Sequence, residues 1–173
     1  QIFFHAQRLR REFAADRDEV VATARAAGVS AIVVPAVDAA SFAEVRACCS
    51  RYAGCAPAYG IHPLYVEDSG EDDLATLRGW LARASGGSER PVAVGEIGLD
   101  FFVAGADVDR QAYFFVEQLK IARDADLPVL LHVRRSVEQV LLTLRRIRVR
   151  GGIAHAFNGS REQAEEFIKL GFK

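Results

Sequence analysis

The stretch "PVAVGEIGLDFF", residues 91–102, decides the fold class of this chain. Its first half is a nearly continuous apolar run, which is typical of a strand covered on both faces, as in a parallel sheet. The run ends on a carboxylate, Glu96, and a second carboxylate, Asp100, follows it. Because a carboxylate at the end of a buried strand is costly without a cation or hydrogen bonds, Glu96 is expected to have a compensating partner.

Similar apolar runs alternate with helical stretches on both sides of this segment. The sequence predicts strands at 31–36, 56–61, 91–96, 127–133 and 151–157, and "QIFF" at residues 1–4 is a further candidate. Helices are predicted at 16–28, 41–54, 71–87, 109–126, 136–147 and 160–171. Alternation of this kind predicts repeated βαβ units and therefore an α/β fold built on a parallel sheet.

Three serines mark expected helix starts. Ser41 with Glu44, and Ser160 with Gln163, have the spacing of a capping box. Ser136 is expected to be the N-cap of the helix that follows it.

The composition is that of one globular domain over residues 1–173. Half of the residues are hydrophobic, 26% are charged and the formal net charge is −1. A chain of this length can bury a substantial core, and no linker divides it. A net charge near zero provides no general attraction to nucleic acid or to a membrane, so an anion-binding site would have to be local.

The sequence also lacks signals for a membrane or secreted protein. Its longest apolar runs are far shorter than the roughly 20 residues of a membrane-spanning helix, and no signal peptide is visible. The three cysteines, Cys48, Cys49 and Cys55, fit neither a disulfide framework nor a common zinc pattern. We therefore expect reduced, half-buried thiols in a cytoplasmic protein without a membrane partner.

Titratable side chains recur where the predicted strands end. His62, Glu96, His132 and His155 stand at or just after such ends, and His5 follows the first apolar run. In parallel α/β proteins these ends lie on one rim, where ligands bind. Imidazole and carboxylate groups bind zinc-like and manganese-like ions, so the sequence predicts a divalent metal site at this rim.

A simpler interpretation stays open for each of these residues. A single histidine at a strand end is usually only hydrogen-bonded, and Glu96 could pair with a neighbouring arginine. The coincidence of several such positions favours the metal site more than any one residue does.

Four motifs resemble the TatD-type metal-dependent hydrolases, a family of deoxyribonucleases within the amidohydrolase-like group. The motifs are "YGIHPLY", "VAVGEIGLDFF", "LPVLLHVRRS" and "GGIAHAFNGS", and the resemblance runs in order over most of residues 12–173. It implies a TIM-type (β/α)8 barrel with one or two divalent metal ions (Zn, Mn or Mg) at its C-terminal mouth.

The resemblance also assigns roles to individual residues. It implies that Glu96 is the catalytic carboxylate that bridges the metal ions, and that His132 and His155 supply two imidazoles to one metal position. His5 aligns with the first histidine of the family's opening His-x-His motif and is expected to bind metal. His62 is expected to face the substrate more than the metal.

Two further residues are expected near the substrate. Arg134 could contact a phosphate, or it could be a solvated side chain before a helix. Asp100 could bind substrate or water, or only brace the loop that follows it. Arg134 and Arg135 are the only obvious phosphate ligands near the rim, and the sequence has no basic stripe interleaved with aromatic residues.

The sequence departs from the family pattern in two places. Gln7 stands where the second histidine of the opening motif is expected, and glutamine is a weak ligand beside imidazole. The sequence ends at Lys173, before the family's last two strands and their aspartate ligand. We therefore expect an incomplete barrel of about six βα units, weak or no catalysis, and an open barrel edge that self-association could cover.

The function predicted from these features is metal-dependent hydrolysis of phosphodiester bonds, with DNA or a related molecule as substrate and a metal-activated water as nucleophile. Two alternatives remain open. One is a barrel hydrolase that acts on amides or esters, and the other is a scaffold protein whose metal site has decayed.

Overall fold

The computed structural model describes residues 2–3, 16–83, 90–155 and 157–173. Six strands form one sheet, in which neighbours in the sequence are neighbours in space and every pairing is parallel. The strands are β1 (Ile2–Phe3), β2 (Ile32–Pro35), β3 (Cys55–Tyr59), β4 (Ala93–Asp100), β5 (Val129–Arg134) and β6 (Gly152–His155).

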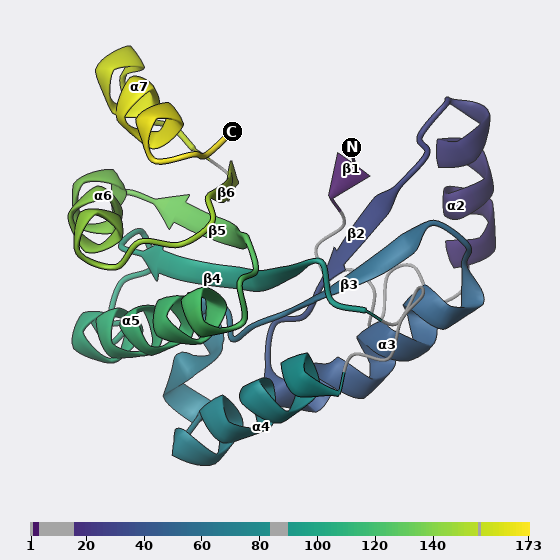
Figure 1. The fold of residues 1–173 in the computed structure, drawn as a ribbon, viewed down its shortest axis with the longest axis horizontal. Coiled ribbons are helices and arrows are strands. Elements are labelled where there is room, and N and C mark those ends of the chain that lie inside the picture. Colours follow the sequence, from purple (N-terminus) through teal and green to yellow (C-terminus); the bar gives the residue numbers. More distant parts are fainter. Residues whose placement is uncertain (1, 4–15, 84–89, 156) are drawn as a thin grey trace.

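Helices connect the strands and cover one side of the sheet. They are α2 (Arg17–Ala26), α3 (Phe42–Arg51), α4 (Glu71–Ala82), α5 (Val108–Asp124), α6 (Val137–Arg146) and α7 (Arg161–Lys169), with two 3-10 helices, η1 (Ala39–Ser41) and η2 (Pro63–Asp68). Figure 1 shows the strands as an inner arc and the helices outside it. The predicted strand–helix alternation is therefore confirmed.

The core lies between this arc and its helices. Strand β4 is buried at every position, as is typical of a parallel strand covered on both faces. Rings of Phe42, Tyr59 and Trp80 pack together with centroids 5.1–5.9 Å apart. Such offset and edge-on aromatic contacts stabilise the packing of α3 and α4 on the sheet.

Strand β4 differs from the prediction in a way that matters for the site. This strand was predicted to end at Glu96, but it continues to Asp100, and its register with β5 shifts between Val94 and Ile97. The prediction was wrong because a buried carboxylate does not have to end a strand. The alternating apolar residues Ile97 and Leu99 continue the strand, and both are fully buried.

The predicted capping boxes had different outcomes. Ser160 and Gln163 form theirs: the Ser160 hydroxyl accepts from the Gln163 N–H, and the Gln163 side chain accepts from the Ser160 N–H. The box predicted for Ser41 and Glu44 was wrong, because Ser41 makes no side-chain cap for α3. It pairs instead with Asp38, which caps η1 one turn earlier.

Ser136 stands at the N-cap position of α6, as predicted, but it makes no capping hydrogen bond. Its hydroxyl donates to the carbonyl of Leu99 at 2.8 Å and so ties the start of α6 to the end of β4. A tertiary contact has replaced the local one.

The three cysteines are unpaired and buried. The prediction of half-burial was wrong, because each of the three residues is at most 7% exposed. Burial raises the pKa of all three thiols. Within the described part of the chain, no helix has both the length and the hydropathy needed to cross a membrane.

Candidate metal centre

Three buried side chains from three consecutive strand regions meet at one point. His62 follows β3, Glu96 lies in β4 and His132 lies in β5. One potential ligand atom of each lies within 4.8 Å of the other two. We call His62, Glu96 and His132 the metal cluster, since two imidazoles and a carboxylate are donors that suit a zinc-like ion.

His132 is the central residue of the metal cluster. Its Nδ1 lies 3.1 Å from Glu96 Oε1 and 3.1 Å from His62 Nε2. Its Nε2 lies 2.8 Å from Asp100 Oδ2. Because Asp100 accepts the Nε2 proton, the neutral ring carries its lone pair on Nδ1, which faces Glu96.

His62 has the same tautomer as His132 but turns its other nitrogen toward the site. The backbone N–H of Leu64 donates to His62 Nδ1 at 3.2 Å, so in the neutral ring Nε2 carries the proton. His62 therefore presents a hydrogen-bond donor to the same point at which His132 presents a lone pair. In this geometry Glu96 and His132 can bind a metal ion, whereas His62 can donate a hydrogen bond beside it.

Helix α5 holds two parts of the site through buried glutamines. The side chain of Gln118 bonds both the N–H and the carbonyl of Ile61, the residue before His62. Gln111 accepts from the backbone N–H of Asp100 at 2.8 Å. Neither glutamine was predicted from the sequence to support the site. Their signal is a polar pair seven residues, about two turns, apart in an otherwise apolar helix stripe.

Both carboxylate oxygens of Asp100 make contacts inside the protein. Its carboxylate is buried, with Oδ2 on His132 and Oδ1 accepting the backbone N–H groups of Phe102 and Val103. These contacts orient His132 and brace the loop after β4, which is the second of the two roles considered from the sequence. Substrate binding by Asp100 stays a prediction without further support.

His132 and Asp100 shift each other's pKa in opposite directions. Burial lowers the pKa of His132, but the hydrogen bonds and charges of Glu96 and Asp100 outweigh it, so the pKa is raised above the ordinary 6.5. Burial raises the pKa of Asp100, but the hydrogen bonds from His132 and from the following loop outweigh it, so the pKa is lowered from 3.8. When His132 is protonated, its two ring nitrogens can donate to Glu96 and to Asp100.

These shifts predict how the stability of the metal-free protein depends on pH. The contribution of His132 is complete below about pH 6.5 and is lost as pH rises through its raised pKa. The contribution of Asp100 is complete above about pH 3.8 and is lost as pH falls through its lowered pKa. Urea unfolding in EDTA should therefore show the largest difference in stability between wild type and His132→Asn inside this window. A constant difference from pH 4 to 9, roughly the range spanned by ordinary acidic and neutral groups, would contradict it.

The donor set fits a divalent metal ion. A cation between Glu96 and the Nδ1 lone pair of His132 would replace the proton that these two groups share, and it would compensate the buried carboxylate. The carboxylate–histidine pair of Asp100 and His132 is the support that metal-binding histidines commonly have.

Asp100→Asn tests this support. The Asp100 Oδ1 position accepts two backbone N–H groups, so the asparagine carbonyl should stay there and its NH₂ should face His132 Nε2. Nε2 must then accept, and the proton moves to Nδ1, where it blocks the metal. We expect the affinity for Zn²⁺ or Mn²⁺ to fall about 10- to 100-fold by calorimetry.

Asp107→Asn is the matched control for this change, because Asp107 caps α5 on the same loop without contacting His132. Equal affinities in Asp100→Asn and wild type would refute the tautomer argument. An NMR shift of the His132 ring nitrogens reports the tautomer directly.

The other predicted site residues are less central. His155 is the register partner of His132 on the neighbouring strand, so both side chains leave the sheet on the same side. It is not a member of the metal cluster, and its role as a ligand stays a prediction.

His5 and Gln7 lie outside the described residues. Arg134 ends β5, with Nη1 4.0 Å from Asp100 Oδ2.

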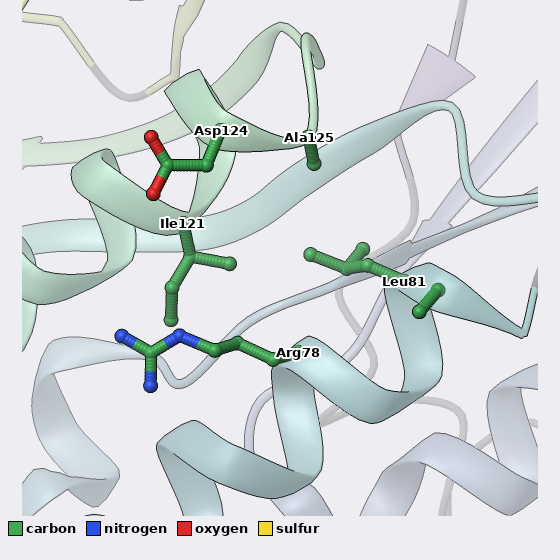
Figure 2. A pocket seen from close by; sticks show the side chains of 6 residues that line it. Arg78, Leu81, Ile121, Asp124 and Ala125 are labelled. Carbon is green, nitrogen blue, oxygen red and sulfur yellow. The ribbon is translucent and has the colours of Figure 1, made fainter.

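A cavity of about 330 Å³ lies elsewhere, between α4 and α5. Figure 2 shows Arg78 and Leu81 of α4 facing Ile121 and Asp124 of α5. These residues belong to the last turns of both helices, which lead into the beginnings of the next strands. The cavity therefore belongs to the rim opposite the strand ends, and it shares no residue with the metal cluster.

The whole chain has relatives among known proteins. A model of the family described as "TatD related DNase" matches residues 4–173. The chain belongs to the TatD-related DNase family. This confirms the resemblance that the four motifs indicated, and TatD-family relatives are named as metal-dependent hydrolases and exonucleases.

Two TatD-family relatives show how much is shared. The chain is 40% identical over 162 residues to the uncharacterized metal-dependent hydrolase YjjV of Escherichia coli (strain K12), covering 93% of this chain and 61% of the relative. It is 34% identical over 163 residues to the 3'-5' ssDNA/RNA exonuclease TatD of Pantoea sp. (strain At-9b), covering 92% and 61%. The chain thus spans about three fifths of the length of these relatives.

Solved structures agree with this assignment. The crystal structure of YjjV, the TatD homologue from Escherichia coli K12, matches with a TM-score of 0.88 and 40% identity, covering 94% of this chain and 62% of that one. A TatD-family hydrolase from Entamoeba histolytica matches in fold with a TM-score of 0.78 at 21% identity, covering 91% and 55%. The α/β fold as part of a TIM-type barrel is confirmed.

Proposed function

We propose that this site belongs to a metal-dependent phosphodiesterase that hydrolyses single-stranded DNA or a chemically similar nucleic acid. The observation that carries the proposal is the buried metal cluster, in which Glu96 and the Nδ1 of His132 converge while Asp100 fixes the histidine tautomer. The family and the TatD exonuclease relatives support this substrate class.

In this proposal, Glu96 and His132 hold the ion, with His155 beside His132 as a further ligand. A bound divalent ion would lower the pKa of a water molecule and polarise the phosphoryl oxygen. His62 donates its Nε2 proton toward the same point and can orient an oxygen of the substrate. Asp100 keeps His132 in the metal-binding tautomer, and Arg134 supplies positive charge beside the site.

The test combines metal titration with turnover of a labelled single-stranded oligonucleotide. We expect Mn²⁺ or Zn²⁺ binding near neutral pH, and cleavage that needs added Mn²⁺ or Mg²⁺ and stops in EDTA. Failure to bind any of these ions would refute the proposal. The same assay tests the expectation of weak catalysis, because rapid cleavage that depends on Glu96 would show it to be wrong.

The two alternatives are tested in the same way. A panel that includes amide and ester substrates distinguishes another barrel hydrolase from a phosphodiesterase, since the metal ligands would look alike. A scaffold protein with a decayed site predicts no metal binding in the titration. The metal cluster argues against decay, because its three side chains are buried together.

Three further expectations are part of the proposal. Residues 1–173 act as a single hydrolase domain, the cytoplasm is the compartment in which its buried thiols stay reduced, and copies could associate through an edge of the sheet. Sedimentation over a range of concentrations tests the last of these. A monomer at high concentration contradicts it.

A further inference from the structure

The loop after β4 exposes three large apolar side chains in a row. Phe101, Phe102 and Val103 are 36%, 45% and 41% exposed. A run of exposed apolar residues costs solubility and calls for a function, whereas single exposed apolar residues are common. The loop begins directly after Asp100, so this surface adjoins the metal cluster.

Two arginines from the next strand end lie against the central ring of this loop. The guanidinium carbon of Arg134 is 3.7 Å from the ring centroid of Phe102, and that of Arg135 is 4.5 Å from it. Both distances are well inside the range of a cation–π contact. We call Phe102, Arg134 and Arg135 the Phe102 platform.

The backbone of Arg135 adds an independent observation. Arg135 has a φ of 54°, in the left-handed region that arginine rarely adopts. Conformations of this kind persist where the surrounding structure enforces them, and they cluster at functional sites. Here the left-handed residue is one that contacts the exposed ring.

The platform is connected to the metal cluster by short contacts. The backbone N–H of Phe102 donates to Asp100 Oδ1 at 2.9 Å, and Asp100 Oδ2 accepts from His132 at 2.8 Å. One carboxylate therefore holds both the metal-binding histidine and the platform loop. A chain of phosphates passing the cluster would reach the platform within its neighbouring nucleotides.

We propose that the Phe102 platform binds a nucleotide next to the scissile phosphate, with a base stacked on Phe102 and a phosphate paired with the guanidinium groups of Arg134 and Arg135. Exposed aromatic rings beside positive charge are how proteins hold single strands without sequence preference. Arginine matches a phosphate with several donors at once. The choice of nucleic acid as ligand rests on the proposed function.

The test removes the ring from the protein and the base from the ligand. Fluorescence anisotropy, with EDTA present to prevent cleavage, compares an oligothymidylate of about 12 nucleotides with an abasic strand of equal length. Phe102→Ala should weaken binding of the oligothymidylate about 5- to 100-fold and leave the abasic strand unchanged, because a base without a ring to stack on loses that contact. Phe102→Trp should restore the difference.

Two further variants complete the design. Arg135→Asn removes the guanidinium, and asparagine tolerates the left-handed backbone at this position. We expect it to weaken the binding of both strands. The slope of log affinity against log salt concentration should fall by about one. Leu142→Ala is the matched control, since Leu142 is 39% exposed on α6 and belongs to no part of the platform. It should change neither affinity.

The failures are distinguishable. Equal effects of Phe102→Ala on both strands, no effect on either, or a change only in the oligomeric state would overturn the platform while leaving the proposed function intact. Wild-type protein that binds neither strand would overturn both. Binding that depends on Phe102, in a protein that binds none of Mn²⁺, Zn²⁺ and Mg²⁺, would support the platform and refute the proposed function.

Discussion

Glu96→Gln is expected to remove metal binding almost completely while leaving the fold intact. Glu96 is buried, and its Oε1 lies 3.1 Å from the lone-pair nitrogen of His132. The amide keeps the shape of the side chain and can donate to that nitrogen, so the metal-free protein should stay folded. It removes the charge and a strong ligand, and we expect affinity for Mn²⁺ or Zn²⁺ to fall at least about 100-fold.

Calorimetric titration measures this change, and any metal-dependent cleavage should fall with it. Glu138→Gln is the matched control, because Glu138 lies on the surface of α6 and bonds Gln163 rather than the site. Urea unfolding of the metal-free variants should give similar midpoints. If Glu96→Gln binds metal as wild type does, the metal cluster is a hydrogen-bonded core and the proposed function loses its basis.

Gly98→Ala is expected to have the largest effect on stability. Gly98 pairs with His132 across β4 and β5, and its φ is 146°. A Cβ at this position would lie 2.1 Å from the carbonyl oxygen of His132. Because the obstacle is backbone and cannot rotate away, the strands must separate, and we expect a loss of about 3 kcal/mol or more in the free energy of unfolding.

Urea denaturation checks this expectation against Gly79→Ala. Gly79 lies inside α4, and a Cβ there meets no atom within 4 Å. Alanine should therefore stabilise that helix by up to about 1 kcal/mol. The change from glycine to alanine should therefore lower the free energy of unfolding at Gly98 and raise it at Gly79. If both variants unfold at the wild-type midpoint, the close approach of β4 to β5 is not what requires glycine in "GEIG".

Parts of the fold and of the site could be predicted because they depend on local sequence. Continuous apolar runs and helix periodicity identify β2 to β6 and their helices. The rule that parallel strands bring their ends to one rim then placed Glu96 near His132. The end of β4 could not be predicted in this way, because the strand continues past its first carboxylate through a shift in register with β5.

The arrangement of side chains at the rim depended on contacts between distant residues. The family resemblance implied that His132 and His155 share one metal position, but nothing in the sequence indicated that the ring of His62, 70 positions earlier, contacts His132. Gln118 fixes the position of His62 through Ile61, and the Leu64 N–H fixes its tautomer. No sequence motif predicts either contact. Likewise, no basic stripe is visible in the sequence, but folding brings Phe102 against Arg134 and Arg135.

By itself, then, the sequence determined the order of strands and helices, the membership of the TatD family and the acid–imidazole chemistry of the rim. Only the tertiary structure decided which imidazole contacts Glu96 and which of its nitrogens carries the lone pair. It also decided that Asp100 forms a hydrogen bond with His132. The physical reason is that apolar periodicity is encoded over a few neighbouring residues, whereas a hydrogen bond at 2.8 Å requires the register of two strands to be known.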